Sequence, residues 1–319
     1  MPFGRVPEGI FIVYNMLYKQ VEGEGKMQKP RMAIVGAGKV GSVLARTLYS
    51  RGYPFAGIIS STLASADKLA AEVGTLAGTK MTDLVQEAQM ILIATPDRCI
   101  GEVIKQMAKN NHFKAGQVVI HLSGGLPVEI LQPAREQGAW VGCMHPLQSF
   151  ANKEHTGEML AGVYFALSGQ EEAIAQAKKM AEDFGGKSFI ILDKDKALYH
   201  AAACIVSNYT VSLMHWAGRL YSRFGLSSEE ALEALVPLLQ GTVQNIRKMG
   251  ATQGLTGPVS RGDSITVGAH LAALASKQEK NLYTHLGMYT LGVALEKGSV
   301  DGEQALQMIK ILTNKGDVK

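Results

Sequence analysis

The sequence has few cysteines, little net charge and no long hydrophobic run, and each of these shortages excludes a class of protein. Its three cysteines, Cys99, Cys143 and Cys204, lie far apart among 319 residues, with neither metal-ligand spacing nor the density of a disulfide framework. The formal net charge is only +4, so we expect no broad basic face for nucleic acid. The apolar run at residues 10–18 is too short to span a bilayer. We therefore expect free thiols in a reducing, cytoplasmic compartment, no bound metal, and no nucleic-acid or membrane partner.

The start of the chain fits a signal peptide poorly. Arg5 and Glu8 precede the apolar run, and no small-residue cleavage site follows it. Residues 19–26 are polar and glycine-rich, and Met27 stands just before the first clear strand. We expect residues 1–26 to form an N-terminal extension outside the fold, as an upstream start codon would produce. A short packed extension is the alternative.

Between residues 31 and 150, short apolar runs alternate with segments of helical periodicity. Strands are expected at residues 31–35, 55–59, 90–94, 117–122 and 139–144. Strands that alternate with helices predict an α/β fold with a parallel, doubly wound sheet and right-handed crossovers. Residues 163–167 and 188–192 predict two further strands, on either side of a helix at 171–184.

The last third of the chain shows the periodicity of helices only. Long apolar-periodic stretches cover residues 196–224, 228–248, 264–276, 282–296 and 302–312. Gly225, residues 250–258 and Gly298 interrupt them. We therefore expect an all-α C-terminal domain over residues 194–319.

A glycine-rich sequence follows the first strand and opens a helix: Gly36, Ala37, Gly38, Lys39, Val40 and Gly41. Gly36 permits the tight turn, Gly38 lets the backbone approach a pyrophosphate, and Gly41 permits close helix–strand packing. A glycine-rich turn without a ligand is the alternative. The run of βα units around the motif favours a Rossmann domain that binds a dinucleotide. The expected segments are thus the extension (1–26), a dinucleotide-binding Rossmann-like domain (27–193) and an all-helical substrate and dimerisation domain (194–319).

The end of the second strand bears on which dinucleotide binds. An NAD-specific site usually places an acid here to hold the ribose 2′-hydroxyl. The sequence instead has Ser60, Ser61 and Thr62, with Lys39 nearby. Hydroxyls and a lysine favour a 2′-phosphate, so we expect NADP rather than NAD.

Two loops after later strands lie at the edge where ligands collect in such sheets. Thr95 and Pro96 are expected to line the dinucleotide, whereas Asp97 is expected to cap the next helix. Ser123 ends the following strand and could hydrogen-bond the nicotinamide amide or a substrate hydroxyl. Turn chemistry is its alternative role.

Histidines supply the expected acid–base chemistry. His145 leaves a strand at this edge, and Pro146 stiffens the backbone after it. An imidazole with a pKa near neutrality can pass the proton that accompanies hydride transfer. Helical spacing places His200, Cys204 and Asn208 on one face, where they would line a cleft. A structural histidine and a helix–helix contact are the alternatives.

A turn-rich loop before a later helix supplies substrate contacts. Arg261 could bind a substrate carboxylate with two parallel hydrogen bonds. Asp263 could cap the helix or hold Arg261. Ser149, which follows the His-Pro pair, completes the expected substrate-binding residues.

These motifs together resemble the family of oxidoreductases that joins a Rossmann-like domain to DUF2520, over residues 31–312. The resemblance rests on the glycine loop and on residues 121–124, 145–150, 199–202, 207–209 and 256–263. Broader relatives are pyrroline-5-carboxylate reductases, hydroxyisobutyrate dehydrogenases and prephenate dehydrogenases. They imply an all-α C-terminal domain, similar to that of 6-phosphogluconate dehydrogenase, that dimerises and closes the active site.

The same resemblance implies roles for single residues. His145 is similar to the histidine of prephenate dehydrogenases that contacts the reacting hydroxyl, and Ser123 to their catalytic serine. Hydroxyisobutyrate-type enzymes use a lysine and an asparagine one helical turn apart. Here His200 is followed at that spacing by Cys204, so their mechanism does not transfer directly.

The expected protein is a homodimeric, NADP-dependent dehydrogenase or reductase that acts on a small carboxylate-bearing hydroxy or imino compound. The expected catalytic residues are His145, Ser123, His200 and Asn208. Substrate would be held by Ser149, Arg261 and Asp263. Two alternatives stay open: a protein that senses NADP without turnover, and an oxidoreductase that couples NADP to deazaflavin F420.

Overall fold

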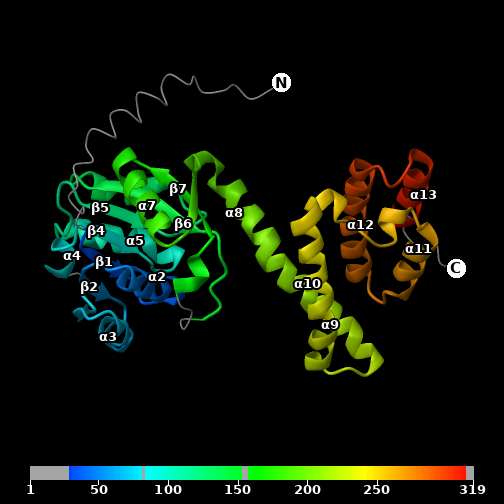
Figure 1. The fold of residues 1–319 in the computed structure, drawn as a ribbon, viewed down its shortest axis with the longest axis horizontal. Helices are drawn as coiled ribbons and strands as arrows, with labels where there is room; N and C mark the ends of the chain where they lie inside the picture. Colours follow the sequence, from blue (N-terminus) through cyan, green and yellow to red (C-terminus); the bar gives the residue numbers. More distant parts are fainter. Residues whose placement is uncertain (1–28, 81–82, 153–156, 314–319) are drawn as a thin grey trace, which may run out of the picture. The chain divides into compact units, whose positions relative to one another are not determined.

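The computed structural model describes residues 29–80, 83–152 and 157–313 (Figure 1). The expected extension, residues 1–26, lies outside the described residues. The chain divides into two compact units, Met1–Asn208 and Tyr209–Lys319, each of which is described by itself below. The division falls after the boundary at residue 193 that periodicity predicts. Within the described ranges, no helix has both the length and the apolarity to cross a membrane.

The first unit contains one eight-stranded sheet with the strand order β3-β2-β1-β4-β5-β6-β7-β8. Its strands are β1 (Met32–Val35), β2 (Phe55–Ile59), β3 (Ala77–Gly78), β4 (Met90–Ile93), β5 (Val118–His121), β6 (Trp140–Pro146), β7 (Tyr164–Gly169) and β8 (Lys187–Ile190). The pair β6–β7 is antiparallel and the other neighbours are parallel. The parallel, doubly wound α/β sheet is therefore confirmed. The short strand β3 was not predicted, because two residues show no periodicity.

Helices cover both faces of this sheet. Side chains on both faces of a strand are therefore buried, which explains why the strands are continuous apolar runs in the sequence, and β1 is an example. Met32 and Ile34 point into one core cluster and Ala33 and Val35 into the other, so all four side chains are buried. The helices and short turns of the first unit are α2 (Lys39–Ser50), α3 (Leu63–Glu72), α4 (Asp83–Gln86), α5 (Asp97–Lys109), η1 (Val128–Leu131), α6 (Gln132–Arg135), η2 (Gly157–Leu160), α7 (Glu171–Asp183), η3 (Asp193–Asp195) and α8 (Lys196–Cys204).

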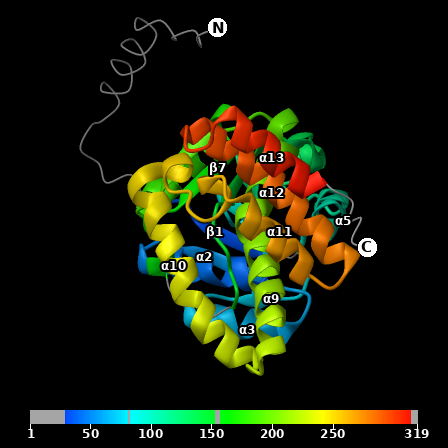
Figure 2. The ribbon, with the colours of Figure 1, turned by 90° about the vertical axis from the view of Figure 1, so that its right-hand side faces the viewer.

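The described part of the second unit is helical throughout, as the sequence predicts. Its elements are α9 (Thr210–Tyr221), η5 (Ser222–Phe224), α10 (Ser228–Gln253), η6 (Val259–Arg261), α11 (Ser264–Ala273), α12 (Lys277–Lys297) and α13 (Gly302–Thr313). Helices α9 and α10 pack side by side, and α11 and α12 pack against α13 (Figure 2). Gly225, Gly250 and Gly298 all have positive φ, which explains why the helical periodicity breaks at these glycines.

The prediction of one regular helix over residues 196–224 is wrong. A π-helical turn, η4 (Ile205–Tyr209), separates α8 from α9. Such a turn inserts a residue into the helical repeat, so Asn208 is not in simple α-helical register with His200.

Candidate functional site

The glycine loop leads from β1 into α2, and the packing around it allows no side chain at two positions. Gly36 has a φ of 118°, and a Cβ there would lie 2.6 Å from the Ala94 carbonyl carbon. A Cβ on Gly41 would lie 2.0 Å from the Gly36 carbonyl oxygen. In contrast, the nearest atom to a Cβ on Gly38 would be 3.9 Å away. The fold therefore requires Gly36 and Gly41, whereas Gly38 leaves space that a ligand can use.

The N-terminus of α2 is suited to an anion. Gly38 is its N-cap, with no side chain to bond the first N–H groups, and the first turn contains no acidic residue. Lys39 is exposed beside it. In the neighbouring loop, the Thr95 hydroxyl oxygen is buried without a hydrogen-bond partner among the described residues. The residues present therefore fit the pyrophosphate of a dinucleotide.

The end of β2 has a similar character. Thr62 is the N-cap of α3 and makes no side-chain capping hydrogen bond, and the first turn of α3 lacks an acid. Ser61 and Thr62 are exposed, and Ser60 is partly exposed. These hydroxyls and the free N–H groups of α3 make a suitable environment for a phosphate group.

A pocket of about 620 Å³ opens beside the carboxyl end of β6, within the first unit. It is lined by His145, Leu147, Gln148, Ser149, Phe189, Tyr199, His200, Ala202, Ala203, Cys204, Val206, Ser207 and Asn208. Four of the predicted site residues, His145, Ser149, His200 and Asn208, are thus brought together. Ser123 is not among the lining residues, and Arg261 and Asp263 belong to the second unit.

His145 contacts two side chains of α8. Its Nδ1 lies 2.6 Å from the Tyr199 hydroxyl oxygen, and its ring meets the Tyr199 and His200 rings edge to face. A Cβ on Gly124 would lie 2.8 Å from both His145 Nε2 and His200 Nδ1. Gly124 thus permits the two histidines to approach the backbone at one point.

The pKa of His145 is lowered to about 4. Burial is the main cause, and the charges of His200 and Lys196 add to it, whereas Asp97 opposes them. The imidazole is therefore neutral at pH 7, and the expectation of a pKa near neutrality is wrong. The sequence locates this histidine, but the desolvation arises only when the chain folds.

The Ser123 hydroxyl makes hydrogen bonds to its own loop and to Asp97 at the start of α5. It donates to Asp97 Oδ2 at 2.6 Å and accepts from the Gly125 and Leu126 N–H groups at 3.3 and 3.1 Å. The alternative of turn chemistry is thus observed. The prediction that Asp97 caps α5 is wrong, because Pro96 is the N-cap and makes no side-chain capping bond.

Lys196 is a buried charge that sequence reasoning missed. It is 1% exposed, and its Nζ donates to the Leu126 carbonyl at 2.7 Å. Burial lowers the pKa of His121 to about 3, and the charge of Lys196 is the next cause. Lys196 stands one helical turn before His200, which is the lysine–asparagine spacing of hydroxyisobutyrate-type enzymes. That spacing was the signal that could have found it.

In the second unit, Asp263 is the N-cap of α11. Its carboxylate accepts from the Thr266 N–H at 3.0 Å and from the Thr266 hydroxyl at 2.6 Å. Of the two roles left open for Asp263, the structure therefore shows the cap. Arg261 is exposed at the end of η6.

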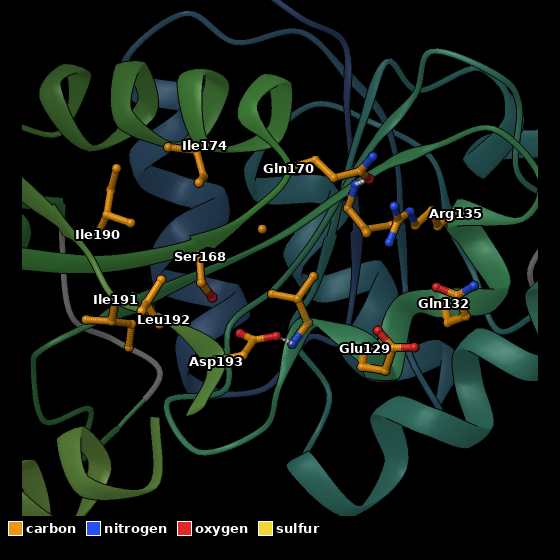
Figure 3. A pocket seen from close by; sticks show the side chains of 13 residues that line it. Glu129, Gln132, Arg135, Ser168, Gln170, Ile174, Ile190, Ile191, Leu192 and Asp193 are labelled. Atoms are coloured by element: carbon orange, nitrogen blue, oxygen red, sulfur yellow. Dashed lines mark hydrogen bonds between the residues drawn. The ribbon is translucent and has the colours of Figure 1, made fainter. Parts of the chain in front are cut away.

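A separate pocket of about 320 Å³ lies in the first unit (Figure 3). Ile174 and Ile190 lie on one side of it, and Glu129 and Arg135 on the other. Its lining contains none of the predicted site residues, so it plays no part in the function proposed below.

The chain thus has a Rossmann-like sheet followed by a helical region, and comparison with known proteins identifies the family that combines these two parts. Two family models match, a Rossmann-like domain over residues 18–146 and DUF2520, a domain of unknown function, over residues 163–290. Protein TM1727 from Thermotoga maritima is 31% identical, with a TM-score of 0.65 over 84% of this chain and 99% of that chain. The chain belongs to the family that joins a Rossmann-like domain to DUF2520.

Two more distant structures share the fold. BF3122 from Bacteroides fragilis, provisionally assigned as an NADP oxidoreductase, is 21% identical, with a TM-score of 0.69 over 83% of this chain and 99% of that chain. A reductive aminase from Aspergillus terreus, in complex with NADPH and ethyl levulinate, is 17% identical, with a TM-score of 0.56 over 89% and 92%. No curated protein matches the chain significantly.

Proposed function

We propose that the protein is an NADP-dependent oxidoreductase, which transfers a hydride to or from a small hydroxy or imino compound that carries a carboxylate. One observation carries the proposal: the glycine loop after β1 and His145 lie at the same edge of the sheet. Strands β1, β4, β5 and β6 are parallel, so the loops after Val35 and Pro146 share the edge where ligands bind in such folds. The similarity of the fold to BF3122 and to the reductive aminase in complex with NADPH supports the same class of function, an NADP-dependent oxidoreductase.

The residues that would hold NADP divide by chemical group. The N-terminus of α2 with Gly38 at its N-cap would hold the pyrophosphate, in a turn that Gly36 and Gly41 allow to form. Ser60 with its neighbouring hydroxyls would hold the 2′-phosphate. Thr95 and Pro96 would line the path between them. When bound, the cofactor supplies or accepts the hydride.

The chain's own residues account for the proton and for orientation. His145 is the proton-handling group, because it is the titratable side chain at the end of β6 and lines the pocket. His200, Asn208 and Ser149 would orient the substrate. Arg261 is proposed as the carboxylate anchor. Ser123 touches Asp97 rather than the pocket and would act as a positioning residue.

Cofactor choice can be measured by calorimetry. We expect NADPH to bind about tenfold or more tightly than NADH, because hydrogen bonds to a phosphate are charge-assisted. The change Ser60→Asp should reverse the preference, since a carboxylate repels the 2′-phosphate and accepts from a 2′-hydroxyl. Ser60→Asn is the matched neutral control and should keep the preference for NADPH. Tighter binding of NADH by the unmodified protein would contradict the proposal.

Turnover distinguishes an enzyme from a sensor. Absorbance should report NADPH oxidation with members of a panel of keto and imino acids. His145→Asn should lower turnover by a factor of ~10² to 10⁴ and leave NADPH affinity nearly unchanged. His215→Asn, an exposed histidine on α9, is the control and should be silent. Intact NADPH binding without turnover of any compound would favour the sensor instead.

A further inference from the structure

We propose that Tyr199 holds His145 in the tautomer that carries its proton on Nε2, so that the site receives a carbonyl or imine acceptor and works as a reductase. The hydrogen-bond assignment stands by itself, whereas its catalytic consequence rests on the function proposed above. The inference begins at the 2.6 Å contact between the Tyr199 hydroxyl and His145 Nδ1.

The proton in this contact belongs to the tyrosine. Burial raises the pKa of Tyr199 to about 12, so it remains a phenol, and His145 remains neutral. A phenol is a good donor but a weak acceptor, and a neutral imidazole nitrogen is a good acceptor. The Tyr199 hydroxyl therefore donates to Nδ1. The only proton of the ring is then on Nε2.

Packing keeps the tyrosine in this position. Phe189 of β8 meets the Tyr199 ring edge to face at a centroid separation of 5.9 Å. His145 of β6 also meets the Tyr199 ring edge to face, at a centroid separation of 5.5 Å. The ring is therefore held between two side chains of the sheet. A hydrogen bond made by a held ring fixes a tautomer more firmly than one made by a mobile side chain.

A second ring nitrogen, His200 Nδ1, lies beside His145 Nε2. His200 Nε2 is 3.7 Å from the Cys204 sulfur, and either atom can be the donor of this contact, because a thiol is both a weak donor and a weak acceptor. His200 Nδ1 is buried and has no hydrogen-bond partner among the described residues. It borders Gly124 together with His145 Nε2. A ligand atom at this border would meet the His145 Nε2–H, which favours an acceptor such as a carbonyl oxygen or an imine nitrogen.

This arrangement favours one direction of reaction. In reduction the hydride adds to the carbonyl carbon, and the oxygen takes the proton of His145 Nε2. As Nε2 loses its proton, the Tyr199 hydroxyl passes its own proton to Nδ1 and becomes a phenolate. One proton from water then adds to Nε2, and the Nδ1 proton returns to Tyr199, which restores the starting state. Oxidation of an alcohol would need a free lone pair on Nε2, which the proton occupies.

His145 stays neutral through the working pH range mainly because it is buried, and four titratable groups face it. They are His200 and Lys196 on α8, His121 on β5 and Asp97 on α5. The charges of His200 and Lys196 lower the pKa of His145 further, whereas the charge of Asp97 raises it. We therefore expect no change of tautomer between about pH 6 and 8.

Nitrogen NMR tests the assignment without turnover. The full chain labelled with ¹⁵N-histidine has eight histidines, and His145→Asn identifies the signals of this one. At pH 7 we expect a protonated Nε2 and an unprotonated Nδ1. Tyr199→Phe should convert His145 to a mixture of tautomers. Tyr164→Phe, a tyrosine of the same sheet that also stacks on Phe189, is the matched control and should leave the signals unchanged. A proton on Nδ1 in the unmodified protein would overturn the proposal, as would unchanged signals in Tyr199→Phe.

Kinetics and binding test the consequence. Tyr199→Phe should lower kcat for reduction by about tenfold or more, with KM and NADPH affinity nearly unchanged. A carbonyl compound should bind the protein–NADP complex more tightly than its alcohol, and a preference for the alcohol would overturn the proposed direction. If the NMR result is as expected but no compound is reduced, the proposed function fails and the hydrogen-bond assignment stands.

Discussion

At the scale of single residues, His121 and His145 make the folded state sensitive to acid. Burial is the main cause of their low pKa values, about 3 and about 4, whereas an unfolded histidine titrates near 6.5. Below pH 6.5 the unfolded chain therefore binds protons that the folded chain does not. The stability that the neutral rings contribute is complete above pH 6.5 and is lost as the pH falls towards 4.

The change His121→Asn should reduce this dependence. Urea unfolding at pH 7 and pH 4.5 measures the loss of stability between the two conditions. We expect that loss to be about 2 kcal/mol smaller in the variant than in the unmodified protein. His215→Asn serves as the exposed control. Equal losses in the variant and the unmodified protein would show that His121 is protonated without cost.

The residue scale also shows where sequence reasoning succeeds and fails. Strand-end position identified His145 as a pocket residue, because the carboxyl edge of a parallel sheet is predictable, and helical spacing identified His200. The Ser123–Asp97 hydrogen bond joins residues 26 positions apart, and no local pattern signals it. The buried charge of Lys196 and the low pKa of His145 likewise depend on packing between elements.

At the scale of elements, the turn between β1 and α2 contains glycines that the packing of the fold requires and one glycine that leaves space for a ligand. Gly41→Ala should destabilise the protein by about 3 kcal/mol or more, because its Cβ would meet the Gly36 carbonyl oxygen. Gly38→Ala should change stability by only about 1 kcal/mol or less. It should nevertheless lower NADPH affinity by about tenfold or more, since the new methyl group occupies the space for the pyrophosphate. Thermal unfolding and calorimetry measure both effects, and equal NADPH affinity in Gly38→Ala and the unmodified protein would remove the pyrophosphate from this loop.

Elements were predicted in proportion to the strength of their periodicity. β2 was predicted with its observed bounds, and β1, β4 and β5 to within a residue at each end, because strands buried on both faces read as apolar runs. The π-helical turn at Ile205–Tyr209 was not predicted, since an extra residue in a helix leaves no mark in composition. Helix α12 begins at Lys277 rather than 282 because Ser276 and Glu279 form a capping box that periodicity alone does not reveal.

At the scale of the whole molecule, large apolar side chains are exposed on several helices of the second unit. In α10, Ala231 and Leu235 are buried, whereas Leu238, Val243 and Met249 are each more than half exposed. Exposed apolar residues continue on α9 and α12. A helix with this distribution of apolar residues is typical of one that packs against a partner.

We expect that partner to be a second copy of the chain, which would cover α10 in a homodimer. Light scattering of the unmodified protein at micromolar concentration should give twice the chain mass of 34.2 kDa. Leu238→Glu should shift the protein to monomer, because a charge in an apolar interface loses its hydration without gaining a counter-ion. Gln240→Glu introduces the same charge at an exposed polar position of the same helix and should leave the dimer intact. A monomeric unmodified protein would leave these apolar residues without a partner copy, and a dimer that tolerates Leu238→Glu would move the interface away from α10.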